Sequence, residues 1–379
     1  MPSIFYTQSD LKHQGQIQLS NQVSVGKQVM NLLVISNCRP HSGWGTYTDN
    51  LKGVIGENGR FINLFGSSRS RVCPGVTEII PGKSSLRQIA ARAMPTVYFR
   101  ALINHIENER KNGLVVHFAY NLLPDIGDSE LDIVTIHDVT FLKHYPHESR
   151  IRNLYSKHLM RTFLRYEHII TVSDYTRRLL KSISGNSNIE VIHSPCPVTF
   201  SHLQVTQDEK RRLGLPEDKT LILSVGNNKP WKNLGMVSKT MKKLGEKFML
   251  VRIGEDIGTG LTFNNIDPVM INLLYNSCDV MLFPSLEEGF GFPVVEAMQT
   301  GLPAVVSDID VFHEIGGNAV EYVDPTDLDS VVNGIHTAQA RKEELRNLGL
   351  SRAVQFGQDV FKKKMLNYYE RATADAGEK

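Results

Sequence analysis

Short apolar segments alternate with longer segments of helical periodicity along most of this chain, and that alternation limits the folds it can adopt. In the first half the apolar segments are 31–36, 61–65, 113–117, 132–136, 168–172 and 189–193. A second series follows the polar residues 204–219, at 220–225, 247–253, 279–283, 303–307 and 319–323. Buried parallel strands joined by crossover helices have this pattern. We therefore predict an α/β protein with two doubly wound, Rossmann-like sheets.

Chain length supports two domains of ordinary size. The 379 residues exceed the usual limit of one hydrophobic core, and a hydrophobic content of 41% can fill two. We predict an N-terminal domain at 1–200, which begins with an irregular segment at 1–28, and a C-terminal domain at 201–355. The two domains are expected to face each other across a cleft. Residues 356–379 should form a helix that packs back on the first domain.

Composition excludes several classes of protein. The 42 Lys and Arg residues nearly balance the 40 Asp and Glu residues, so no broad basic surface for nucleic acid is expected. The cysteines are scattered without a C-x-x-C pair, which disfavours zinc and disulfide frameworks; they are Cys38, Cys73, Cys196 and Cys278. Residues 1–30 are polar, and no apolar run approaches the roughly 18 residues of a membrane span. We expect a cytoplasmic protein.

One basic stretch leaves contact with a membrane open. The segment 86–100 carries Arg87, Arg92 and Arg100, and the sequence SSRSR precedes it. Such residues could touch anionic lipid at the inner face of a membrane. A solvated helix face explains the same pattern and is the favoured interpretation.

Polar residues follow several of the predicted strands, where ligands of parallel sheets collect. A buried strand ends in His137 and Asp138, although a structural histidine is equally consistent with the pattern. Another strand reaches Gly226 and is followed by Lys229 and Lys232. Two ammonium groups at a strand-to-helix turn suit a diphosphate, and a solvated loop is the alternative.

The first predicted strand leads into a segment rich in small residues. Gly43 and Gly45 are expected to lie in a loop, with a helix over 46–53, so that backbone amides can approach an anion. A dinucleotide-binding pattern would need a third glycine where Thr48 stands. A simple tight turn explains the glycines equally well.

The stretch FPSLEEGFGFPVVEAM, residues 283–298, is too irregular for one helix or one strand. Pro293 suits the first turn of a helix, which places Glu296 in that turn and Glu288 in the preceding loop. Gly289, Phe290 and Gly291 separate the two carboxylates, and exposed aromatic rings with open amides suit ligand contact. The alternative is that Glu296 only favours the helix N-terminus while Glu288 is solvated.

A D-x-D spacing occurs at Asp308 and Asp310, in the sequence SDID. Such a pair can hold a divalent metal with a nucleotide sugar. Because it follows a strand as a loop, we do not expect a metal site here.

Five segments together resemble the retaining glycosyltransferases of the GT-B fold that carry a Glu-x7-Glu element. They are SGWGTYTDNL, TIHDVTFLKHYP, HIITVSDYTRRLL, SVGNNKPWKNL and CDVMLFPSLEEGFGFPVVEAMQTGLPAVVSD, in the order that this family has, within roughly residues 30–370. The Glu-x7-Glu element is EGFGFPVVE.

The resemblance implies a role for each candidate residue. Gly43 and Gly45 would lie near the donor diphosphate and the acceptor, and His137 beside the transferred sugar. Lys232 matches the phosphate-binding lysine, whereas Lys229 stands where many members have arginine, which puts its role in doubt.

The same resemblance assigns the residues of the Glu-x7-Glu element. Glu288 would bind sugar hydroxyls and Glu296 the ribose, while the amides of Gly289, Phe290 and Gly291 would face the sugar and the diphosphate.

By this resemblance the protein is a retaining, metal-independent hexosyltransferase without a cofactor, and GDP-mannose is its expected donor. The alternatives are a UDP-glucose or other UDP-sugar donor, a GT-B epimerase or phosphorylase, and a binding module without transfer activity. The expected acceptor is a glycan, a lipid-linked sugar or a small molecule, a protein acceptor is also open, and no motif decides among them.

Overall fold

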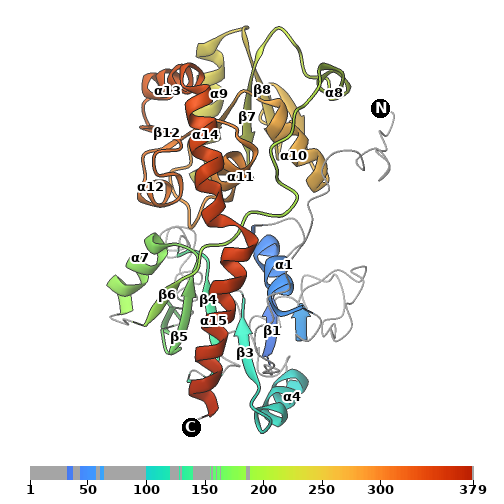
Figure 1. The fold of residues 1–379 in the computed structure, drawn as a ribbon. Helices are drawn as coiled ribbons and strands as arrows, with labels where there is room; N and C mark the ends of the chain where they lie inside the picture. Colours follow the sequence, from blue (N-terminus) through green and yellow to red (C-terminus); the bar gives the residue numbers. More distant parts are fainter. Residues whose placement is uncertain are drawn as a thin grey trace. The chain divides into compact units, whose positions relative to one another are not determined.

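Two parallel sheets, each of six strands, are formed by the residues that the computed structural model describes (Figure 1). Those residues are 32–36, 43–56, 60–63, 100–119, 128, 130–139, 154, 157–158, 160–162, 164–184 and 188–377. Both sheets belong to one unit, Asn31–Lys379. The predicted α/β class with two parallel sheets is confirmed.

The first sheet has the strand order β2-β1-β3-β4-β5-β6. Its strands are β1 (Leu32–Ser36), β2 (Arg60–Asn63), β3 (Val115–Phe118), β4 (Ile133–Ile136), β5 (His168–Thr171) and β6 (Ile189–Val191). The helices described in this half are α1 (Gly43–Ile55), α4 (Arg100–Arg110) and α7 (Asp174–Ser184). Strands β1, β3 and β4 are buried throughout, as the apolar segments predicted.

The second sheet has the order β12-β11-β10-β7-β8-β9. Its strands are β7 (Thr220–Val225), β8 (Phe248–Ile253), β9 (Leu261–Phe263), β10 (Val280–Phe283), β11 (Ala304–Ser307) and β12 (Glu321–Val323). Its helices are α8 (Gln207–Arg212), η3 (Pro230–Lys232), α9 (Leu234–Leu244), α10 (Pro268–Ser277), α11 (Phe292–Thr300), α12 (Asp310–Gly316), α13 (Leu328–Ala340) and α14 (Lys342–Ala353). The central position of β7 and β10 places the loops that follow them side by side.

Eleven strands lie within the predicted apolar segments or within two residues of them, and β9 was missed. β9 has only three residues, all half-buried, and it follows Gly258 and Gly260, which have positive φ. A strand this short at the edge of a sheet has too few residues to show a period.

A long helix at the end of the chain returns to the first sheet. After η4 (Val354–Phe356), α15 (Gln358–Gly377) packs against α1, and Figure 1 shows the two helices side by side. The buried Tyr369 contributes its hydroxyl to a 2.7 Å hydrogen bond with Nδ1 of His117 in β3. Gln358 donates to the side-chain oxygen of Asn50 at 2.9 Å. These contacts attach the end of the chain to the first half.

Several predictions concern residues that lie outside the described parts of the chain. The irregular segment 1–28, the SSRSR sequence and most of the basic stretch 86–100 lie there. Among the described residues, no helix is both long and apolar enough to cross a membrane.

Candidate functional site

Lys232 and Glu288 meet at the carboxyl ends of β7 and β10. Lys232 ends the short helix η3 after β7, and Glu288 lies in the loop after β10. The Lys232 Nζ lies 2.5 Å from Glu288 Oε1, and the two side chains are only 15% and 13% exposed. The ammonium also lies 5.0 Å from the centre of the Phe283 ring. Two residues 56 positions apart thus form a partly buried, charge-assisted pair.

A hydrogen bond joins the loops after β7 and β10, and a buried arginine supports the first of them. The amide of Leu286 donates to the carbonyl of Trp231 at 2.7 Å. Under the β7 loop the fully buried Arg252 donates to the carbonyl of Gly226. Gly226 has a φ of 134°, which favours glycine. Arg252 was missed by the sequence reasoning, because an arginine inside an apolar strand shows no motif.

Lys229, the second predicted phosphate ligand, is not brought to this pair. It is exposed, and its ammonium lies 5.8 Å from the centre of the Trp231 ring. Within the described part of the chain, no interaction joins Lys229 to Lys232 or Glu288. The structure therefore gives Lys232 a defined partner, Glu288, and leaves Lys229 exposed to solvent.

Gly289 fits closely against the segment that carries His137. A Cβ atom added at Gly289 would lie 2.4 Å from the carbonyl oxygen of His137 and 2.6 Å from Cβ of Asp138. The Gly289 carbonyl accepts a 2.6 Å hydrogen bond from Ser173 Oγ, just before α7. Only glycine permits this approach, which puts the loop after β10 directly beside the end of β4.

The amides of this loop are open to a ligand. Among the described residues, no hydrogen bond engages the amides of Gly289, Phe290 or Gly291. Phe290 itself is only 4% exposed and packs on Phe292 and Phe356, with ring centres 5.2 and 6.0 Å away. The prediction of exposed aromatic rings is therefore wrong for Phe290. The ring is drawn into the core because the tight turn at Gly291, with a φ of 97°, reverses the chain.

His137 is buried and neutral. Its Nε2 donates to the carbonyl of Ala119 at 3.0 Å, and its ring meets the Tyr47 ring edge-on with centres 4.7 Å apart. Burial lowers the pKa of His137 to about 4. The ring is thus held in one orientation, and its proton stays on Nε2 at neutral pH.

Glu296 differs from the prediction in its position on the helix. α11 begins at Phe292, so Glu296 lies in the second turn and not in the first. The helix starts earlier than predicted because Gly291 adopts a left-handed conformation at its N-cap. Tyr275 of α10 donates a 2.5 Å hydrogen bond to Glu296 Oε2. Burial raises the pKa of Glu296 to about 7, and the Tyr275 hydrogen bond acts against that rise.

The positions of Gly43 and Gly45 relative to the helix also differ from the prediction. They were expected in a loop before a helix over 46–53, but α1 begins at Gly43 and contains both. The prediction gave too much weight to the poor helix propensity of glycine. The amides of the first helical turn have no intrahelical partner, so they can still approach an anion, as they would in a loop.

Another carboxylate, which the sequence did not predict, lies at the start of α7. Glu314 of α12 accepts from the amides of Asp174 and Tyr175 at 2.6 and 3.0 Å, and from His193 Nε2 at 2.7 Å. Burial alone would raise the pKa of Glu314, but these hydrogen bonds outweigh it and the pKa is lowered. Like the Ser173 contact, Glu314 connects the first half to the second.

The predicted D-x-D pair is engaged on the surface. Asp308 lies 2.5 Å from His313 Nε2, and Asp310 lies 3.1 Å from Arg178. No group of three or more His, Cys, Asp or Glu residues suited to a metal occurs in the described part of the chain.

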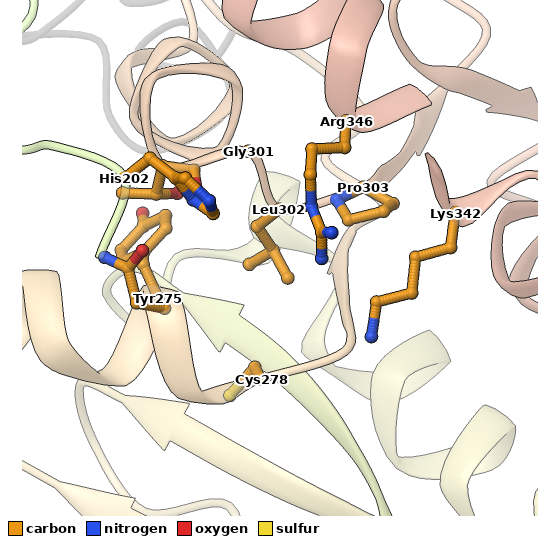
Figure 2. Close-up of a pocket in the computed structure, with 10 residues that line it drawn as sticks. His202, Tyr275, Cys278, Gly301, Leu302, Pro303, Lys342 and Arg346 are labelled. Atoms are coloured by element: carbon orange, nitrogen blue, oxygen red, sulfur yellow. The ribbon is translucent and has the colours of Figure 1, made fainter. Parts of the chain in front are cut away.

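A separate pocket in the second half is lined by residues that include Cys278 and Pro303, just before β10 and β11 (Figure 2). Its lining contains none of the predicted site residues, but it includes Tyr275, the partner of Glu296. The lining residues are His202, Tyr275, Asn276, Cys278, Thr300, Gly301, Leu302, Pro303, Lys342 and Arg346.

Comparison with known proteins finds one matching family profile and several similar sequences. A family profile described as glycosyl transferases group 1 matches residues 205–351. O-antigen chain mannosyltransferase RfbU of Salmonella typhimurium is 28% identical over 214 residues, which cover 52% of this chain and 58% of that protein. O-antigen chain mannosyltransferase B of Escherichia coli is 32% identical over 102 residues, 26% of each chain. The chain thus spans little more than half of the first relative's length.

Solved structures match over nearly the whole chain. A sucrose-phosphate synthase from Thermosynechococcus elongatus superimposes with a TM-score of 0.75 at 16% identity, covering 91% of this chain and 99% of that one. WaaG, a glycosyltransferase involved in lipopolysaccharide biosynthesis, gives a TM-score of 0.64 at 14% identity, covering 85% and 94%. The protein therefore has the GT-B fold, and its residues 205–351 match the profile described as glycosyl transferases group 1.

Proposed function

We propose that the protein transfers a hexose from a nucleotide diphosphate sugar to an acceptor hydroxyl, with retention of configuration at the anomeric carbon. The contact between Lys232 and Glu288 carries this proposal. It joins a cation suited to phosphate and a carboxylate suited to sugar hydroxyls at one edge of a parallel sheet. The match of residues 205–351 to the glycosyl transferases group 1 profile supports it independently.

The donor would replace the ion pair as the partner of each side chain. Lys232 would bind the diphosphate, and Glu288 would accept hydrogen bonds from hydroxyls of the transferred sugar. The open amides of Gly289, Phe290 and Gly291 would serve the sugar and the diphosphate. Glu296 would accept from the ribose, and the carbonyl of His137, beside Gly289, would face the anomeric carbon.

The reaction breaks the bond between the anomeric carbon and the phosphate oxygen, and the electron pair leaves with the nucleoside diphosphate. A bond to the acceptor oxygen forms on the same face, and the acceptor proton passes to the departing phosphate. Lys232 and the amides stabilise the negative charge that grows on the phosphate. We propose that they suffice without a metal ion, so that EDTA leaves turnover unchanged.

GDP-mannose is the proposed donor. Several relatives are named mannosyltransferases, including the O-antigen enzymes of Salmonella typhimurium and Escherichia coli. By the same relatives the acceptor would be a glycan or lipid-linked sugar of a cell-surface polysaccharide. A UDP-sugar donor is the alternative that the donor test must separate.

The deciding experiment is a donor screen with the purified protein. GDP-mannose, UDP-glucose and related sugars are compared by thermal shift, and products with an acceptor library are identified by mass spectrometry. Stabilisation by GDP-mannose and a mass gain of one hexose are expected. Stabilisation by UDP sugars alone would overturn the GDP assignment, and donor binding without turnover on any acceptor would favour a binding module.

A further inference from the structure

Tyr275 makes a direct contact with Glu296, the residue assigned to the ribose. We propose that Tyr275 is a positioning residue that orients the Glu296 carboxylate toward the ribose hydroxyls of the donor nucleotide. This inference rests on the proposed function, since it concerns the same donor site. Tyr275 lies outside the Glu-x7-Glu element and would set how tightly the nucleoside is held.

The contact comes from a well-fixed side chain. Tyr275 is fully buried in α10, a helix whose start is capped by Asp267 through the amides of Val269 and Met270. Its ring meets the Phe200 ring edge-on, with centres 5.2 Å apart. The hydroxyl can therefore point in only a small range of directions, and it donates to Glu296 Oε2 at 2.5 Å.

One carboxylate oxygen is thus occupied and the other remains available. Among the described residues, Glu296 Oε1 makes no hydrogen bond. A carboxylate held through one oxygen cannot rotate freely, so the second oxygen keeps a fixed direction for an incoming hydroxyl. The conformational entropy of the Glu296 side chain is then lost on folding and not on nucleotide binding.

The hydroxyl of Tyr275, which donates to Glu296, is neutral, and this suits a residue that orients a carboxylate. An ammonium group would cancel the carboxylate charge and compete with the ribose, whereas a phenol leaves the charge in place. Hydrogen bonds to a charged acceptor are also stronger than neutral ones. Tyr275 can therefore fix the carboxylate without weakening it as an acceptor.

The pocket that Tyr275 borders limits which substitution is informative. Tyr275 borders the pocket in Figure 2, across from Lys342. A truncation to alanine would enlarge this pocket and disturb α10. Phenylalanine keeps the ring and removes only the hydroxyl.

The test is a double-mutant cycle on nucleotide binding. Wild type, Tyr275→Phe, Glu296→Gln and the double variant are titrated with GDP and UDP, and with their 2′-deoxy and 3′-deoxy forms, by calorimetry. We expect the wild type to prefer the ribonucleotide about tenfold, and Tyr275→Phe to weaken its binding about fivefold. Tyr275→Phe should also reduce the preference for ribose and have no further effect in the Glu296→Gln background.

Each other outcome has a defined meaning. If the wild type binds neither nucleotide, the proposed function fails and this inference fails with it. If Glu296→Gln weakens the ribonucleotide but Tyr275→Phe does not, the donor site stands and the positioning role is wrong. Equal losses for ribose and deoxyribose forms in Tyr275→Phe would show a structural role only, and would overturn the proposal.

A matched control separates general loss of stability from positioning. Tyr322→Phe removes another hydroxyl of the same half, which donates to the carbonyls of Phe312 and Gly317. It should lower the melting temperature without changing the preference for ribose. If Tyr275→Phe proves too unstable, the four proteins are compared in sucrose, an osmolyte that favours the folded state.

Discussion

The two glutamates of the Glu-x7-Glu element lie in different surroundings. Glu288 follows β10 in a loop and pairs with a cation, Lys232. Glu296 lies within α11, half-buried, and pairs with the neutral hydroxyl of Tyr275. Two identical side chains eight positions apart thus have different partners, one charged and one neutral.

This difference decides how each glutamate can respond to a ligand. The charge of Glu288 is balanced until a donor separates it from Lys232, so its contribution depends on an exchange of partners. Among the described residues no cation pairs with Glu296, and burial raises the pKa of Glu296 to about 7. The contribution of Glu296 therefore depends on whether its carboxylate is protonated.

Removing the cation at the Glu288 end should have the largest effect. Lys232→Ala is expected to lower kcat about 10²- to 10³-fold, because the leaving diphosphate loses a preorganised positive charge. Steady-state kinetics with the identified donor measures the change. Lys239→Ala, at an exposed lysine of α9, serves as the control and should leave kcat unchanged. Near-wild-type turnover in Lys232→Ala would remove Lys232 from the diphosphate site.

Between the two glutamates, Gly289→Ala should have the second largest effect. The added Cβ would lie 2.4 Å from the His137 carbonyl oxygen, so the loop and the end of β4 must separate. We expect a loss of about 1–3 kcal/mol in unfolding free energy and about a tenfold loss of turnover. Gly235→Ala is the control, since nothing lies within 4 Å of its added Cβ. Equal behaviour of both variants would show that the close approach does not matter.

The Glu296 end should show the pH effect. Its pKa rises from 4.5 to about 7 on folding, so the folded protein binds more protons than the unfolded chain between these values. Its contribution to stability is therefore present below pH 4.5 and is lost as pH rises through 7. Glu296→Gln should remove this loss, as measured by denaturant unfolding from pH 4.5 to 8.

Two buried histidines make the comparison with wild type necessary. Burial lowers the pKa of His117 to about 3 and of His137 to about 4, so their contribution to stability is lost as pH falls below 6.5. Only the difference in stability between wild type and Glu296→Gln, measured at each pH, isolates the contribution of Glu296. In wild type, nucleotide affinity should rise through pH 7, because the ionised carboxylate is the better acceptor, and it should stay flat in the variant. Parallel pH profiles would contradict the raised pKa.

Lys229→Ala should have the smallest effect. Its ammonium lies in solvent beside Trp231 and is not joined to Lys232 or Glu288. A surface cation contributes about 0–1 kcal/mol, so we expect less than about a threefold change in donor KM. A tenfold change would mean that Lys229 reaches the diphosphate once the donor is bound.

Local patterns predicted much of this arrangement. The positions of β7 and β10 followed from their apolar runs, and Lys232 and Glu288 followed from the polar residues after them. The exact start of α11 did not follow, because Pro293 suits several positions in a first turn and Gly291 decided among them. The burial of Phe290 did not follow either, since a single aromatic residue in a loop has no period that would show which way it points.

The partners of these residues could not be predicted at all. Tyr275 and Arg252 occupy apolar segments and show no motif, and the fit of Gly289 against His137 joins residues 152 positions apart. Such contacts depend on how helices and sheets pack, and a linear pattern carries no information about that.

The sequence by itself determined the α/β class, the two series of strands and most residues of the proposed donor site, because strand period and turn chemistry are local properties. Only the tertiary structure decided that one glutamate faces a lysine and the other a tyrosine. That choice sets the electrostatic surroundings of each carboxylate, since these depend on burial and on neighbours brought together from distant parts of the chain.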